Sequence, residues 1–228
     1  MCYFSPSGAW FQRGQTLPAE ILKVNSATPE PALISYAAAR IRSGHVVGMP
    51  TDTFYGLAVD PINLRAVDRV YDIKSRSRHK PLSLLIENVD QAEDLVNELS
   101  DDFYALAEKF WPGPLTIIVK ASSRLPLKVT ANTGNVAIRV PDSPIALALV
   151  RAAGTPITAT SANLSGASEC TTAESVRVQL GDRIPLIVDG GTTPRTVAST
   201  IVDLSDGAKW RVIREGAVPI DQITEILD

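Results

Sequence analysis

Four cations occupy alternate positions in the segment "IKSRSRHKP", which spans residues 73–81. They are Lys74, Arg76, Arg78 and Lys80, and no acid lies among them, although the whole chain has a formal charge of -3. Like charges at this spacing repel one another, so the segment is either well solvated or faces an anion. Lysine offers a phosphate a point charge and arginine offers it a bidentate fork. The segment therefore predicts a phosphate-bearing ligand, with a solvated surface loop as the alternative.

Three other segments place polar residues at the ends of apolar strands. In "GMPTDTFYG" the residues Thr51, Asp52 and Thr53 can contact a small ligand, or can cap a turn. In "PITATSANLSG" the hydroxyl and amide side chains lie beside backbone N–H groups and can form an uncharged anion nest, or a capped loop. The third segment, residues 199–216, is the weakest of these signals. Separately, Arg139 interrupts the apolar strand "NVAIRVP", where it either points to solvent or clamps an anion.

Several common kinds of site are not indicated. The sequence has no GxxxxGK[ST] loop, no GxGxxG, no GxSxG and no HExxH, and it holds two histidines only. Neither cysteine belongs to a CxxC pair, so we expect no metal held by protein side chains. A pI near 5.5 excludes a protein that coats nucleic acid by bulk charge. No apolar run approaches the ~20 residues of a membrane span, and the start of the chain is no secretory signal, which predicts a cytoplasmic protein.

The periodicity predicts alternating helices and strands. We expect helices over 31–44, 63–74, 89–113 (one long or two short), 143–154, 171–181 and 221–227, and strands over 45–51, 81–87, 114–121, 135–141, 156–162, 184–191, 198–205 and 209–216. Several strands are continuously apolar, as in a sheet covered on both faces. The prediction is a single α/β domain at 29–228, with a twisted mixed sheet flanked by helices, after an N-terminal arm at 1–28.

Taken together, the polar segments resemble one family. The stretches "PTDTFYGLA", "KSRSRHKPLSLLI", "WPGPLTIIVKA", "VAIRVPD", "TSANLSG" and "STIVDL" with "IREG" follow one another as in the YrdC-type threonylcarbamoyl-AMP synthases. The resemblance runs from about residue 31 to about residue 218. Its most specific elements are the Lys-x-Arg pair at 74 and 76 and the Ser-x-Asn pair at 161 and 163.

The resemblance implies a function as well as a fold. Such proteins have a YrdC-like fold with a large, positively lined cavity. They are nucleotidyltransferases that make L-threonylcarbamoyl-AMP and pyrophosphate from L-threonine, bicarbonate or CO2, and ATP, with Mg2+ held by the phosphates. Other proteins then pass the threonylcarbamoyl group to adenosine 37 of tRNAs that read codons starting with A. The chain resembles the short form of the family, which lacks an extra C-terminal domain.

The resemblance also implies roles for particular residues. Catalysis would rest on Lys74, Arg76, Ser161 and Asn163. Threonine would be held by Thr53 and Arg139, with Arg139 on its carboxylate. The nucleotide would contact Arg76, Lys80, Ser161, Asn163, Ser199 and Arg214. Two positions depart from relatives, Leu85 where some have His and Ala159 where many have Ser or Thr, so the threonine contacts are the least determined.

Two other functions remain open at this point. A binding module could grip RNA with the same cations and catalyse nothing. A related carbamoyl or adenylyl transferase could act on another substrate, although the lack of CxxC motifs disfavours the hydrogenase-maturation carbamoyltransferases. The sequence allows tRNA or a downstream threonylcarbamoyl-transferase complex as a partner, and no membrane.

Overall fold

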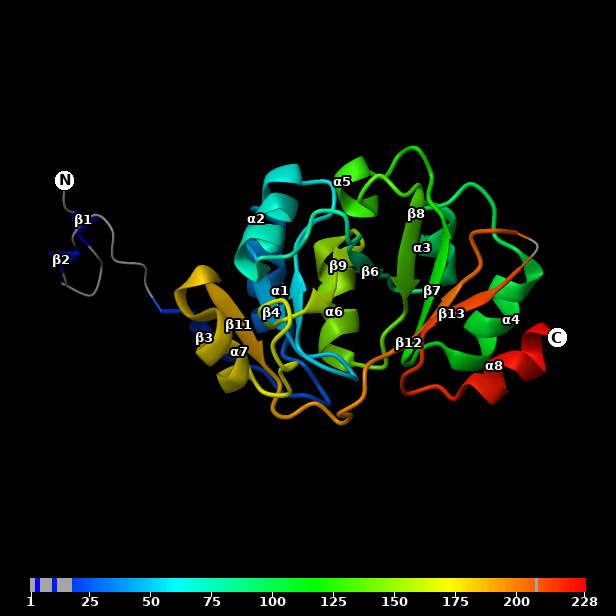
Figure 1. The fold of residues 1–228 in the computed structure, drawn as a ribbon. Coiled ribbons are helices and arrows are strands. Elements are labelled where there is room, and N and C mark those ends of the chain that lie inside the picture. The colour runs from blue at the N-terminus through cyan, green and yellow to red at the C-terminus, as the bar shows by residue number, and fades with distance from the viewer. Residues whose placement is uncertain (1–2, 5–9, 12–17, 208) are drawn as a thin grey trace.

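The computed structural model describes residues 3–4, 10–11, 18–207 and 209–228, and Figure 1 shows its elements in chain order. Two short strands, β1 (Tyr3–Phe4) and β2 (Trp10–Phe11), pair with each other. Of the arm predicted at residues 1–28, residues 1–2, 5–9 and 12–17 lie outside the described residues. Among the residues that are described, no helix is long and apolar enough to span a membrane.

The strands form two large sheets rather than the single mixed sheet that we predicted. One sheet has five strands in the order β10 (Thr160–Ser161), β5 (Gly56–Ala58), β4 (Val47–Met49), β11 (Leu186–Asp189) and β3 (Glu20–Lys23). The other has six in the order β13 (Arg211–Arg214), β12 (Thr200–Asp203), β7 (Leu115–Lys120), β8 (Asn135–Arg139), β6 (Ser83–Leu85) and β9 (Ile157–Thr158). Each sheet mixes parallel and antiparallel pairs.

The chain passes from one sheet to the other inside a segment that we predicted as one strand. Residues 156–162 break at Ala159, so that β9 pairs with β6 of the six-stranded sheet and β10 pairs with β5 of the five-stranded sheet. The Ala159 N–H donates to the carbonyl of Ser83, 2.9 Å away. Apolar periodicity cannot detect this break, because the residues around it are buried in either sheet. The two sheets therefore meet at β9 and β10.

Helices cover both sheets. They are α1 (Pro31–Arg42), α2 (Leu64–Lys74), α3 (Val89–Glu93), α4 (Asp101–Phe110), α5 (Leu127–Thr130), α6 (Pro144–Ala153), α7 (Ala173–Leu180) and α8 (Ile220–Leu227), with a 3₁₀ turn at Gly181–Arg183. α1 and α6 pack together and share an apolar core with the five-stranded sheet (Figure 1). A second core includes residues of both sheets together with α2, α4 and α7, and α7 packs on β11 and β4 of the five-stranded sheet.

Capping residues in the sequence predicted α6 correctly, whereas no sequence signal predicted β3. Ser143 caps α6 by accepting from the Ala146 N–H, Pro144 occupies the first turn, and Gly154 ends the helix with φ of +72°, as predicted. The arm predicted through residue 28 is wrong for Glu20–Lys23, which form β3 parallel to β11. β3 is an edge strand that is mostly exposed, so backbone pairing holds it and no buried periodicity marks it.

Candidate active site

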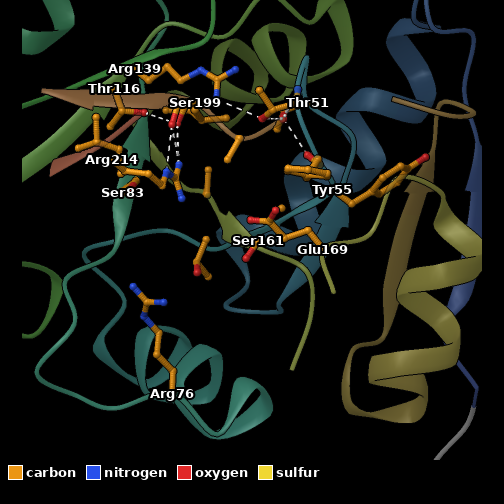
Figure 2. A pocket seen from close by; sticks show the side chains of 18 residues that line it. Thr51, Tyr55, Arg76, Ser83, Thr116, Arg139, Ser161, Glu169, Ser199 and Arg214 are labelled. Carbon is orange, nitrogen blue, oxygen red and sulfur yellow. Dashed lines mark hydrogen bonds between the residues drawn. The ribbon is translucent and has the colours of Figure 1, made fainter. Parts of the chain in front are cut away.

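A polar pocket lies where the two sheets meet (Figure 2). Six of the predicted site residues line it: Arg139, Ser161 and Arg214 from strands of the two sheets, and Thr53, Arg76 and Ser199 from segments between elements. The remaining lining residues are Thr51, Phe54, Tyr55, Gly56, Ser83, Leu85, Thr116, Ala159, Thr160, Glu169, Ala198 and Ile201. Three predicted site residues, Lys74, Lys80 and Asn163, do not line it. Leu85 and Ala159, noted above as departures from relatives, do.

Arg139 lies at one end of the pocket with its guanidinium turned inward. It is 6 % exposed, and its Nε donates to the Gly113 carbonyl at 2.8 Å. One Nη contacts the Thr53 hydroxyl at 3.3 Å, and the other forms an ion pair with the carboxylate of Asp52. Of the five guanidinium N–H groups, these bonds to described residues use three. The remaining two bond to no described residue and are left for a ligand, and the burial of Arg139 shows that the solvent-facing alternative is wrong.

Asp52 and Arg195 are parts of this site that sequence reasoning missed. The Asp52 side chain is fully buried, and Arg195 donates from one Nη to its carboxylate at 3.2 Å and to its backbone carbonyl at 3.0 Å. Burial lowers the pKa of Arg139, and the charge of Asp52 opposes that effect. The position of Asp52 between two threonines at a strand end was a signal that we noted without assigning it a role.

The threonines after β4 organise their own turn and also support Arg139. The Thr51 hydroxyl donates to the Phe54 carbonyl at 2.7 Å and accepts from the Thr53 N–H at 3.1 Å. The turn-capping alternative is therefore confirmed for Thr51, while the Thr53 hydroxyl contacts the Arg139 guanidinium and the ligand contact stays a prediction. The Tyr55 hydroxyl donates to the Gly191 carbonyl at 2.7 Å and ties the turn to the chain that follows β11.

The four cations of the 73–81 segment separate in the structure. Lys74 is buried at the end of α2, and Arg76 lines the pocket and donates to the Pro81 carbonyl at 2.9 Å. Arg78, which follows α2 in the chain, is exposed and pairs with Asp68 and Asp72 of that helix. Lys80 is exposed and lies outside the pocket. Thus one of the four cations, Arg76, reaches the pocket directly, and burial lowers its pKa.

Lys74 holds the Ser161–Asn163 turn from behind the pocket wall. Its Nζ donates to the carbonyl of Ser161, to the carbonyl of Asn163 at 2.7 Å and to Asn163 Oδ1 at 3.1 Å. These three acceptors match the three donors of an ammonium group. Burial lowers the pKa of Lys74 to about 8. Lys74 does not line the pocket, and protein oxygens surround its ammonium group, so the catalytic role that the resemblance implies stays a prediction.

The side chain of Asn163 is occupied within the same turn. Its Oδ1 accepts from the Ser161 hydroxyl at 2.6 Å, and its Nδ2 donates to the Ala167 carbonyl at 2.6 Å. The Ser-x-Asn pair therefore shapes a turn whose Ser161 faces the pocket. Glu169, further along this segment, supplies the one carboxylate in the lining.

Ser199 and Arg214 meet on the opposite wall because β12 and β13 are neighbours. Arg214 donates to the Ser199 carbonyl at 2.8 Å and to its hydroxyl at 3.1 Å, and that hydroxyl also shares a hydrogen bond with Thr116 at 2.9 Å. Gly216 permits this approach, since a Cβ there would lie 2.3 Å from the Ala198 carbonyl oxygen. The two predicted nucleotide residues thus form one donor-rich wall.

The arrangement suits an anion that extends across the pocket. Figure 2 shows Arg139, Ser199 and Arg214 on one side of the pocket and Arg76 on the other. In the described part of the chain, no group of three His, Cys, Asp or Glu side chains could hold a metal ion. The arginines in the lining could align an anionic substrate and compensate its charge.

Comparison with known proteins identifies similar chains. A family model named Sua5_yciO_yrdC, described as "Telomere recombination", matches residues 39–216. The threonylcarbamoyl-AMP synthase of Bacillus subtilis is 42% identical over 195 residues, which cover 85% of this chain and 56% of that protein. A putative threonylcarbamoyl-AMP synthase of Mycobacterium tuberculosis is 37% identical over 191 residues, 84% of this chain and 87% of that protein. The chain spans little more than half the length of the first curated relatives it matches.

A solved structure matches the fold closely. The structure of Sua5 from Pyrococcus abyssi in complex with L-threonine superposes with a TM-score of 0.88 at 35% sequence identity. The match covers 92% of this chain and 61% of that one. The two-sheet architecture is therefore that of a protein in which threonine has been seen bound.

Proposed function

The chain belongs to the Sua5/YciO/YrdC family, and we propose that it makes L-threonylcarbamoyl-AMP and pyrophosphate from L-threonine, bicarbonate or CO2, and ATP. One observation carries the proposal beyond the names of relatives. The pocket combines Arg139, whose guanidinium keeps two N–H groups that no described residue accepts, with Arg214 on the same side and Arg76 on the other side (Figure 2). A substrate pair whose carboxylate lies at Arg139 and whose phosphates extend from Arg214 toward Arg76 fits that distribution of charge.

The amino acid is proposed to bind at Arg139 and Thr53. A guanidinium holds a carboxylate with two parallel bonds, which fixes orientation as well as charge. The threonine complex of the Pyrococcus abyssi relative supports an amino acid in this fold. The nucleotide is proposed to contact Arg76, Ser161, Ser199 and Arg214, all of which line the pocket.

The proposed reaction has two bond-forming steps. The threonine amine attacks the carbon of CO2 and loses a proton, which gives a carbamate. A carbamate oxygen then attacks the α-phosphorus of ATP, and the bond to the β-phosphate oxygen breaks to release pyrophosphate. Negative charge spreads over the phosphate oxygens in such a transfer, and Arg76 and Arg214 are placed to compensate it.

A magnesium ion would fit the donors present. Mg2+ commonly binds through substrate phosphates with one or two carboxylates and water, and neutralises charge on the leaving pyrophosphate. Glu169 is the carboxylate in the pocket lining that could face such an ion, and the phosphates would supply most of its ligands.

Three residues have indirect roles in the proposal. Lys74 and Asn163 shape the turn that presents Ser161, and their side chains are occupied by protein partners. Lys80 would contact a phosphate only after it moves toward the pocket. The product is proposed to serve cytoplasmic threonylcarbamoyl modification of adenosine 37 in tRNA, through a downstream transferase.

Pyrophosphate release tests the proposal. We expect release from ATP only when threonine and bicarbonate are both present, together with a product of the mass of threonylcarbamoyl-AMP. Omitting each component in turn provides the controls. RNA binding without any threonine-dependent pyrophosphate would instead favour the binding module, and release with another amino acid would favour a related transferase.

A further inference from the structure

A fully buried carboxylate lies between two guanidiniums behind the amino-acid end of the pocket. Asp52 pairs with Arg139 through one oxygen and with Arg195 through the other, at 3.2 Å. Asp52 and Arg195 are not among the lining residues, whereas Arg139 is. The three side chains carry a net charge of +1.

The charge of Arg195 affects how strongly Arg139 can attract the carboxylate of a ligand. With Asp52 alone, Arg139 would belong to a neutral ion pair, and the net attraction for a substrate carboxylate at that end would be left to Arg214, whose charge also acts on Arg139. The substrate carboxylate would also lie near the buried Asp52 carboxylate, which repels it, and burial strengthens that repulsion. Arg195 offsets the charge of Asp52, so the charge of Arg139 remains available for a ligand.

We infer that Arg195 is a positioning and specificity residue for the amino-acid carboxylate, acting through Asp52 on Arg139. The inference rests on the proposed function, in which Arg139 binds that carboxylate. Arg195 comes from the connection between β11 and β12, which joins the two sheets, and it bonds both the side chain and the backbone of Asp52. It therefore fixes the residue that orients Arg139 and also supplies the second positive charge.

The test compares two ligands that differ at one group. Calorimetry measures the binding of L-threonine and of L-threoninamide, which lacks the carboxylate, to the full chain and its variants without ATP. Arg195→Gln keeps a hydrogen-bond donor but removes the charge, and Arg195→Lys keeps the charge. We expect Arg195→Gln to lower the preference for threonine over threoninamide by about tenfold, as for one charge-assisted contact. Arg195→Lys should stay within about threefold of the parent protein.

A matched control and a second-site change separate charge from structure. Arg211 also pairs with a buried carboxylate, that of Asp203 at 2.6 Å, outside the pocket, so Arg211→Gln should leave the preference unchanged. Adding Asp52→Asn to Arg195→Gln returns the net charge to +1 and should recover at least part of the preference. The kinetic counterpart is a rise in KM for threonine with KM for ATP unchanged.

Several results would overturn the inference. They are an unchanged preference in Arg195→Gln, an equal loss of both ligands, failure of Arg195→Lys to retain the preference, or no recovery in the double variant. A failure of the proposed function can be distinguished from these results. In that case the parent protein itself would bind threonine no better than threoninamide, or would release no pyrophosphate.

Discussion

Replacing Lys74 by methionine should change how stability depends on pH. Burial lowers the pKa of Lys74 from 10.5 to about 8, whereas in the unfolded chain it stays near 10.5. Above pH 8 the unfolded chain therefore binds a proton that the folded protein has released, and the parent becomes more stable as pH rises toward 10.5. At 1.36 kcal/mol for each tenfold step in acidity, the gain from pH 7 to pH 9.5 is about 2 kcal/mol.

Urea unfolding of the parent and of Lys74→Met at both pH values measures this gain. The difference in unfolding free energy between the two proteins should shift by about 2 kcal/mol in favour of the parent at pH 9.5. Groups that do not interact with Lys74 titrate alike in both proteins and cancel, and a Cys170→Ala background removes the thiol whose pKa Lys74 lowers. A difference that stays constant between the two pH values would refute a buried Lys74 with a lowered pKa. The same variant should lose turnover, because the carbonyls of Ser161 and Asn163 lose their donor and the turn shifts.

Three further changes test other parts of the pocket. Arg76→Ala should weaken ATP binding or turnover at least tenfold, about the 1.5–3 kcal/mol of a charged hydrogen bond. Arg78→Ala, which removes surface ion pairs and a cation–π contact with Tyr71 outside the pocket, should not. Steady-state kinetics that rank the two variants alike would remove Arg76 from the site. Arg139→Lys keeps the charge without the fork, so it should raise KM for threonine far more than KM for ATP, and equal rises would indicate a phosphate role. Gly216→Ala forces a Cβ against the backbone of Ser199. Thermal unfolding should therefore show a loss of about 1–3 kcal/mol in the free energy of unfolding, and ATP binding should weaken. A variant with the stability and ATP affinity of the parent would contradict the close approach.

The sequence predicted those elements that depend on short-range signals. α6 carries its capping serine, its first-turn proline and its terminal glycine within one segment, and these lie where expected. The 89–113 segment forms two short helices, α3 and α4, rather than one long helix, and Ser100 caps the second of them. The division into two sheets was missed because strand pairing depends on residues far apart in the chain.

The resemblance brought together residues that no local pattern connects. Thr53, Arg76 and Arg214 come from distant segments and line one pocket. The resemblance did not predict which charged and polar groups surround the site residues. The contact of Arg195 with Asp52 spans 143 residues and depends on the path between the sheets. The burial of Lys74 depends likewise on how the 161–163 turn folds over the end of α2.

A crystal structure of the protein with L-threonine and a non-hydrolysable ATP analogue tests the central claim most directly. We predict the threonine carboxylate on the free donors of Arg139, the amine toward the interior of the pocket, and the phosphates between Arg76 and Arg214. The α-phosphorus should lie within reach of a carbamate formed on that amine. Threonine bound elsewhere, or an analogue whose phosphates avoid both arginines, would contradict the account.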